Sequence, residues 1–208
     1  MATSRPTAAA GTSPASLRRR GAVLERAILE SALEQLSTVG WSGLTMERVA
    51  AGAQTGKAAV YRRWPSKQDL VADALEAGLP VLDQAADHGG IREDLLRLCL
   101  RVRDAMFSPT GIALRSVLHE CDTASAQRFQ GVIFTRVVEP STRLLQDVVR
   151  RGVMRGDVRP DAAGDLVFDV IPGLMMYRSK VCGSEWPDQD IADMIDQVMV
   201  PLLSPRNG

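Results

Sequence analysis

The sequence has few aromatic residues, few cysteines and no long apolar segment. Phe, Trp and Tyr together make up 4% of the 208 residues, and Ala, Leu, Val and Arg are abundant. This composition favours helices over sheets. Because no run of about 18 apolar residues occurs, we expect no membrane-spanning helix. Cys99, Cys121 and Cys182 show no CxxC spacing, and we expect free, buried thiols in a reducing cytoplasm.

Patterns of catalytic and metal-binding residues are also missing. The two histidines, His88 and His119, lie in different segments without the partner spacing of a metal site. No Ser, Cys or Lys has a visible base nearby, and no Gly-rich phosphate loop occurs. We therefore expect no enzymatic activity, no metal and no cofactor.

The net charge is zero, but the charges are unevenly distributed. Residues 1–71 hold ten Arg or Lys and five Asp or Glu, whereas residues 72–208 hold fifteen and twenty. A basic first third followed by an acidic remainder indicates one part that meets phosphate and another that does not. The asymmetry argues against an architectural DNA-binding protein, which would be basic throughout.

Helical periodicity begins after an N-terminal stretch that has nothing to pack. Residues 1–16 are rich in Pro, Ser, Thr, Ala and Gly, and we expect a disordered arm rather than a transit peptide. Thr45 and Ser66 are expected to cap two helices, and Pro65 to end another. Within residues 17–78 we predict four helices, at about 17–39, 47–51, 57–63 and 66–78.

Residues 79–208 continue the helical pattern without a strand signal. The predicted fold class is therefore all-α, with a small N-terminal domain and a larger helical C-terminal domain. Pro140 is expected to interrupt one helix and Pro172–Gly173 to kink another, which Asp161 would cap. We predict these helices at about 91–107, 111–121, 125–155, 161–181 and 187–203.

Residues 45–64 combine two short predicted helices with a tight turn. This geometry places a helix in the DNA major groove. Val49, Ala50 and Val60 can close a small core between the helices. The second helix has a low outer face that can approach base edges, made by Gly56, Ala58 and Ala59. The candidate phosphate contacts are Lys57, Tyr61, Arg62, Arg63 and Lys67. From these residues alone, a helical hairpin with a solvated basic face remains an alternative.

The stretch from Gly40 to Leu70 resembles the N-terminal domain of TetR/AcrR-type regulators. Their pattern has Thr opening a helix, an Ile/Val-Ala pair, a turn, then Leu/Val-Tyr-x-His-Phe, x-Ser-Lys and Leu. The matching residues here are Thr45, Val49–Ala50, Ala53, Val60–Tyr61, Trp64, Ser66–Lys67 and Leu70. One departure is the turn, which commonly reads Ala-Gly-Val-Ser. Gln54 replaces its Gly, and we expect strain because Gln tolerates positive φ poorly.

The resemblance implies a three-helix helix-turn-helix DNA-binding domain over residues 17–78. It also implies that Thr45, Tyr61 and Lys67 hold phosphates. It assigns base-edge contacts to Gln54, Thr55, Lys57, Ala58 and Ala59, and the expected interface also includes Arg62, Arg63 and Trp64. Arg20 and the two arginines before it would reach the minor groove or the DNA backbone. A merely solubilising charge run is the alternative for them.

Apolar stripes near the C-terminus predict a homodimer. The stripe residues of the two last helices are Val170, Leu174, Ile191, Met194, Ile195, Val198, Met199 and Leu202. Two such helices can pack with their copies from a second chain as a four-helix bundle. The resemblance implies this arrangement, which presents two recognition helices to a palindromic operator. The alternative is that both stripes serve the monomer's own core.

The resemblance further implies that residues 79–208 form an effector-binding and dimerisation domain. A small apolar effector would enter it and lower the affinity for the operator. The candidate ligand-binding residues are Met106, Phe107, His119, Phe129, Phe134, Met175, Met176, Tyr177 and Arg178. For each of them, core packing is the alternative. A protein partner in place of the small molecule, and activation in place of the family's usual repression, also remain open.

Overall fold

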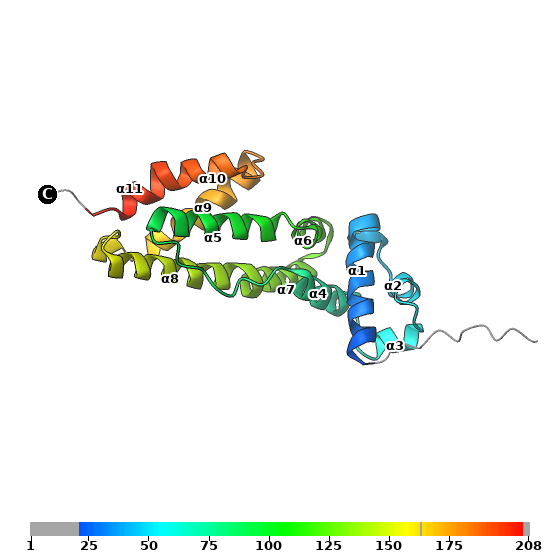
Figure 1. Cartoon of the computed structure of the whole chain (residues 1–208). Helices are drawn as coiled ribbons and strands as arrows, with labels where there is room; N and C mark the ends of the chain where they lie inside the picture. The colour runs from blue at the N-terminus through cyan, green and yellow to red at the C-terminus, as the bar shows by residue number, and fades with distance from the viewer. Residues whose placement is uncertain (1–20, 163, 206–208) are drawn as a thin grey trace, which may run out of the picture.

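The computed structural model describes residues 21–162 and 164–205, so the expected arm and Arg20 lie outside the described residues. Within these ranges every regular element is helical and no strand occurs, as predicted. Helices α1 to α4 lie toward one end of the molecule, and α10 and α11 lie toward the other, near the C-terminus (Figure 1). None of the described helices combines the length and apolarity that a bilayer-spanning segment requires.

The N-terminal helices begin and end close to the predicted positions. Thr45 accepts a hydrogen bond on its hydroxyl from the Arg48 N–H (3.3 Å), and Ser66 accepts one from the Asp69 N–H (3.1 Å), so both predicted caps are confirmed. Gly40 has φ 69°, which breaks the first helix near its end. The helices are α1 (Ala22–Gly43), α2 (Met46–Gly52), α3 (Lys57–Tyr61) and α4 (Lys67–Gly78).

A first hydrophobic core forms around α1. Ile28 and Ala32 on α1 and Leu70 on α4 are fully buried. The same core includes Leu114 of α6 and Phe129 of α7. Helices α1 to α4 therefore share one packed interior with α6 and α7. Helix α6 packs directly against α1, the helix that supports α2 and α4.

A second core lies between the C-terminal helices. Leu95 on α5 and Val148 on α8 are fully buried, together with Ile191 on α10. Helix α5 runs beside α8 and carries α10 on another side (Figure 1). The helices are α5 (Ile91–Met106), α6 (Pro109–Glu120), α7 (Thr123–Ile133), α8 (Glu139–Arg155), α9 (Asp165–Val181), α10 (Asp188–Met194) and α11 (Val200–Leu203).

Two wide helical turns precede two prolines. The π-helical segments η1 (Phe134–Val138) and η3 (Ile195–Met199) end two residues before Pro140 and Pro201. A proline ring lacks the N–H of a regular turn and crowds the carbonyl four residues earlier, and a π-turn relieves that crowding. The predicted interruption near Pro140 therefore takes this form. The chain continues as a helix on both sides of it.

The start of α9 differs from the prediction. Gly164 occupies the N-cap, and Asp161 lies instead in a short 3-10 turn, η2 (Pro160–Ala162). Its carboxylate pairs with the Arg159 guanidinium (2.7 Å), so the expectation that Asp161 caps this helix is wrong. Helix α9 continues as one helix through Pro172.

Trp186, in the connection between α9 and α10, ties α9 to α5. Its indole is buried, and its Nε1–H donates to the Met175 carbonyl and to the Ser179 hydroxyl, both at 3.1 Å. The Arg103 guanidinium of α5 donates to the Trp186 carbonyl (2.7 Å). Because only Ile171 and Met175 of α9 are buried, these contacts contribute much of what positions that helix.

A buried carboxylate holds the connection between α4 and α5 against α8. The side chain of Asp94 is fully buried, and it accepts the His88 N–H (2.7 Å) and the Arg155 guanidinium (3.0 Å). Arg155 also pairs with Asp87 (2.7 Å) and Asp157 (3.2 Å). Burial opposes ionisation, but the His88 and Arg155 hydrogen bonds outweigh it and hold the pKa of Asp94 below its ordinary value.

We predict that Asp94→Asn lowers the free energy of unfolding by about 2–4 kcal/mol at neutral pH, since it leaves buried donors poorly paired. A lowered pKa means that the ionised carboxylate stabilises the fold above its unfolded-state pKa. This stabilisation disappears as the pH falls through the folded-state value. Urea unfolding of both proteins should therefore show a large difference at pH 7 that shrinks below about pH 4. Asp83→Asn, on an exposed carboxylate, is the control, and an equal loss there would contradict the role of Asp94.

Candidate DNA-binding interface

Helices α2 and α3 pack through a small apolar core, as a helix-turn-helix requires. Val49 and Ala50 of α2 and Val60 of α3 are 0–3% exposed. Ala53, in the turn, is buried with them. The Thr55 N–H donates to the Ala50 carbonyl (2.9 Å), which closes the turn. Since helices this short are unstable alone, this contact fixes the orientation of α3.

The outer face of the turn and α3 carries most of the expected DNA contacts. The expected residues that lie exposed are Thr45, Gln54, Lys57, Ala58, Tyr61 and Arg62, and those half-buried are Thr55, Ala59, Arg63 and Lys67. Their cationic and small side chains suit close approach to a phosphate-lined groove.

Trp64 does not belong to this face. It is 4% exposed in the first core, and its Nε1–H donates to the Asp73 carboxylate (2.7 Å). The expectation that Trp64 contacts DNA is therefore wrong. Trp64 occupies an apolar position of the motif, so its side chain packs into the core. Its indole anchors the end of α3 to α4.

Lys57 is held by two neighbours. Its ammonium forms an ion pair with Glu47 of α2 and lies 5.3 Å from the centre of the Tyr61 ring. The hydrogen bond from Lys57 lowers the pKa of Glu47, and the same bond raises the pKa of Lys57. Sequence reasoning missed Glu47 because the pairing crosses the turn, and its distance depends on the angle between the helices.

Lys67 is also engaged within the chain. Its ammonium donates to the Trp41 carbonyl and lies 4.1 Å from the centre of the Trp41 ring. Burial lowers the pKa of Lys67, whereas the nearby Glu120 carboxylate opposes that change. To hold a phosphate, as expected for Lys67, the ammonium has to use its other N–H donors or leave this position.

Trp41 and Glu120 join this surface to the following helices. The Trp41 ring packs edge-on against Phe129 of α7, with ring centres 5.3 Å apart. The Glu120 carboxylate, at the end of α6, accepts the Ser42 N–H (3.2 Å). A Cβ on Gly40 would lie 3.1 Å from that carboxylate. The turn after Gly40 thus contacts both α6 and the first residue of α4.

The expected ligand-binding residues are not brought together in one cavity. Phe129 belongs to the first core and Met175 to the second, whereas Met106 and Phe107 are half-buried. The remaining five are exposed, namely His119, Phe134, Met176, Tyr177 and Arg178. Two shallow hollows of about 360 and 320 Å³ lie around Val153 and Pro160, and none of the nine residues lines them.

Half of the expected dimer stripe on the last helices faces inward. Ile191, Met194, Ile195 and Met199 are 0–4% exposed and pack in the second core of their own chain. These four residues therefore have no surface to offer a second copy, and the own-core alternative holds for them. Val170, Leu174 and Leu202 are half-buried, and Val198 is exposed.

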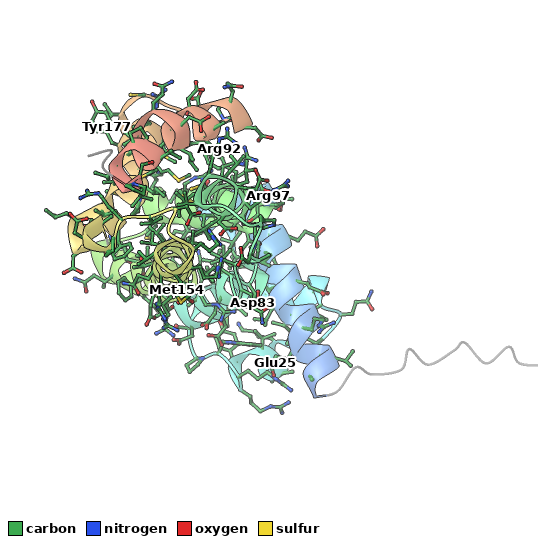
Figure 2. All side chains as sticks on the ribbon, turned by 60° about the vertical axis from the view of Figure 1, so that its left-hand side comes forward. Glu25, Asp83, Arg92, Arg97, Met154 and Tyr177 are labelled. Atoms are coloured by element: carbon green, nitrogen blue, oxygen red, sulfur yellow. The ribbon has the colours of Figure 1, made fainter. Side chains whose placement is uncertain are left out.

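Helix α9 instead exposes an apolar stripe that the sequence analysis did not single out as a surface. Leu166 is 82% exposed, Tyr177 57% and Val181 66%. With half-buried Val170 and exposed Gly173 they follow four- and three-residue spacing, so they share one side of the helix. Tyr177 lies at the edge of the C-terminal helices in Figure 2. We call these five residues the α9 stripe.

A pair of short helices with a small shared core, beside a cationic exposed face, defines a helix-turn-helix DNA-binding protein. The chain matches the model of bacterial regulatory proteins of the tetR family over residues 28–74. It also matches the model of the tetracyclin repressor-like C-terminal domain over residues 85–198. The chain therefore belongs to the TetR family of transcriptional regulators.

Similar proteins span almost the whole chain. An uncharacterised HTH-type transcriptional regulator of Mycobacterium tuberculosis is 32% identical over 189 residues, 88% of this chain and 90% of that protein. A DNA-binding transcriptional repressor TetR of Mycobacteroides abscessus is 29% identical over 191 residues, 89% and 97% of the two chains.

Solved structures share the fold at low sequence identity. A TetR transcriptional regulator from Agrobacterium tumefaciens has a TM-score of 0.67 at 16% identity, with 88% of this chain and 95% of that chain covered. A regulator from Saccharomonospora viridis, solved in complex with choline, has a TM-score of 0.61 at 16% identity, with 88% and 98% covered.

The turn between α2 and α3 stores backbone strain at Gln54, whose φ is 55°. A non-glycine residue in the left-handed region of φ is strained by about 1–2 kcal/mol. Glycine removes this strain, but it loses more conformational entropy on folding, which offsets part of the gain. We predict that Gln54→Gly raises the free energy of unfolding by about 0.5–1 kcal/mol. Gln127→Gly, in the regular helix α7, should lower it by about 1 kcal/mol. Thermal unfolding of both variants checks this, and destabilisation by Gln54→Gly would show that the Gln side chain itself supports the turn.

Proposed function

We propose that this chain is a sequence-specific repressor of transcription in the cytoplasm, which binds a palindromic operator as a dimer and is released by a small apolar effector. The exposed face of α3 carries the proposal. There, Ala58 is flanked by Lys57, Tyr61 and Arg62, on a helix oriented by a capped partner. Small residues allow close approach to base edges, and the polar side chains around them contact phosphates.

The proposed contacts divide into two kinds. Thr45, Tyr61 and Arg62, with Arg63 at the end of the helix, hold phosphates, and Lys67 joins them after leaving Trp41. Gln54, Thr55, Lys57, Ala58 and Ala59 face the bases. Phosphate contacts set the affinity for all DNA and its salt dependence, whereas base contacts set the sequence preference.

Selection from random double-stranded DNA tests this division. We expect the purified protein to enrich an inverted repeat. Tyr61→Phe should weaken binding to selected and unrelated duplexes by a similar factor, because a phosphate contact carries no sequence information. Ala59→Ser should instead change the base preferred at one position of each half-site. No enrichment at all, or equal effects of both variants on every duplex, would contradict the assignment.

The proposed dimer forms through the α9 stripe. Exposing its apolar side chains to water is unfavourable, and contact with the same surface of a second copy buries them. A two-fold arrangement of this kind also matches the symmetry of a palindromic site. The α9 stripe replaces the inward-facing residues of α10 and η3 in this role.

We predict that Tyr177→Glu shifts the protein from dimer to monomer. It places an unpaired charge in the buried interface, which should weaken association by at least about 100-fold. Sedimentation velocity measures the change. Val81→Glu adds the same charge at another exposed apolar residue, in the connection between α4 and α5, and should leave the dimer intact. A dimer that persists in Tyr177→Glu would place the interface elsewhere.

Relatives support the regulatory part of the proposal. The Mycobacteroides abscessus relative is named a repressor, and the Saccharomonospora viridis protein was solved with choline, a small molecule. In this chain α5 joins the two cores, because Leu95 lies in the second core and Met106, at the end of the helix, packs against the first; the π-turn at Phe134 follows α7 of the first core. We place the effector there, because π-turns often occur at functional sites. Binding of a protein partner, and activation of transcription, are the alternatives.

A further inference from the structure

The DNA-facing surface contains an acidic residue, Glu47, which the proposed function does not use. It lies on the first turn of α2 and forms an ion pair with Lys57, the first residue of α3. The two side chains are 52% and 58% exposed, so solvent and DNA can reach both. The Tyr61 ring borders the same ammonium on another side.

Folding alone gives little reason for this pair. Exposed ion pairs contribute little to stability, because water and salt screen them. At a DNA interface a carboxylate carries a cost, since it lies close to phosphates of the same charge. The pair also neutralises a lysine that would otherwise release counterions from any DNA. Glu47 therefore weakens binding to DNA in general, unless a particular base pair compensates for it.

We propose that Glu47 is a specificity-determining residue, which together with Lys57 reads one G·C base pair in each half-site. In the major groove guanine presents two acceptors, O6 and N7, and its partner cytosine presents the N4 amino donor. The Lys57 ammonium donates to the guanine while the Glu47 carboxylate accepts from the cytosine. Both side chains are thereby satisfied while they remain neighbours. The proposal rests on the DNA-binding role of this surface.

Other base pairs fit this donor and acceptor less well. An A·T pair presents one donor, the adenine N6 amino group, between two acceptors, adenine N7 and thymine O4, and adds the thymine methyl group. Lys57 and Glu47 together leave one of these acceptors unpaired. On unrelated DNA, Lys57 reaches a phosphate only by leaving Glu47, which then lies uncompensated beside the backbone. The Glu47–Lys57 ion pair thus favours one base pair and disfavours the others.

Glu47→Gln tests the proposal, because it keeps the shape of the side chain and removes its charge. Two duplexes are compared over a range of salt concentrations, the site selected by the wild-type protein and a scrambled duplex of equal composition. Glu93→Gln is the matched control. It removes a carboxylate from another exposed ion pair, with Arg97 (2.6 Å), which lies on α5 and not on α2 or α3.

We expect Glu47→Gln to bind scrambled DNA about 3–10-fold more tightly at low salt, with a salt dependence steeper by about one ion. Binding to the selected duplex should weaken, so that discrimination falls by at least about tenfold. Repeated selection should show one G·C position relaxed toward A·T, since Gln pairs well with adenine. Glu93→Gln should match the wild type throughout.

Two results would overturn the proposal. An equal gain on both duplexes would mean that Glu47 acts only through its charge, and no change on either would leave a surface ion pair without a role in binding. If the wild-type protein itself selects no sequence, the proposed function fails, and this inference with it. If the wild-type protein selects a site and Glu47→Gln distinguishes that site from scrambled DNA equally well, only the role of Glu47 is contradicted.

Discussion

Burial of one face of α1 is the constraint on which the rest of the structure depends. Ile28 and Ala32 are fully buried, against helices that come both before and after residue 78. Helices α2 and α3 are too short to be stable without such support, since isolated helices below about 12–15 residues are marginal in water. The orientation of the DNA-facing surface is therefore set by α1, and α6 and α7 set the position of α1.

Local features of this fold could be predicted because local chemistry decides them. The caps at Thr45 and Ser66 and the interruption before Pro140 follow from hydroxyl acceptors and a missing N–H. The same proline argument applies at Pro201, where the sequence analysis did not use it. The residues that pack against an apolar stripe come from distant parts of the sequence, so local chemistry does not identify them. The stripe at Ile191 is compatible with a second copy or with the chain's own core, and only the tertiary arrangement shows that it packs against the chain's own α5 and α8.

The candidate site shows the same division. Spacing placed Lys57 and Tyr61 on the exposed face correctly, but it also placed Trp64 there, because a motif does not distinguish supporting residues from contacting ones. Both lysines on or beside this face have intramolecular partners, Glu47 for Lys57 and Trp41 for Lys67. On the proposed function, DNA competes with these partners, and this competition is the proposed means of distinguishing one sequence from another.

The central claim is that two copies of this chain bind one two-fold symmetric DNA site. The most direct measurement is the mass of the complex with a short duplex carrying the selected inverted repeat, determined by sedimentation equilibrium with the duplex labelled. The account predicts two chains per duplex, and loss of that complex when one half-site is scrambled. A single chain per duplex, bound equally well after one half-site has been scrambled, would contradict it.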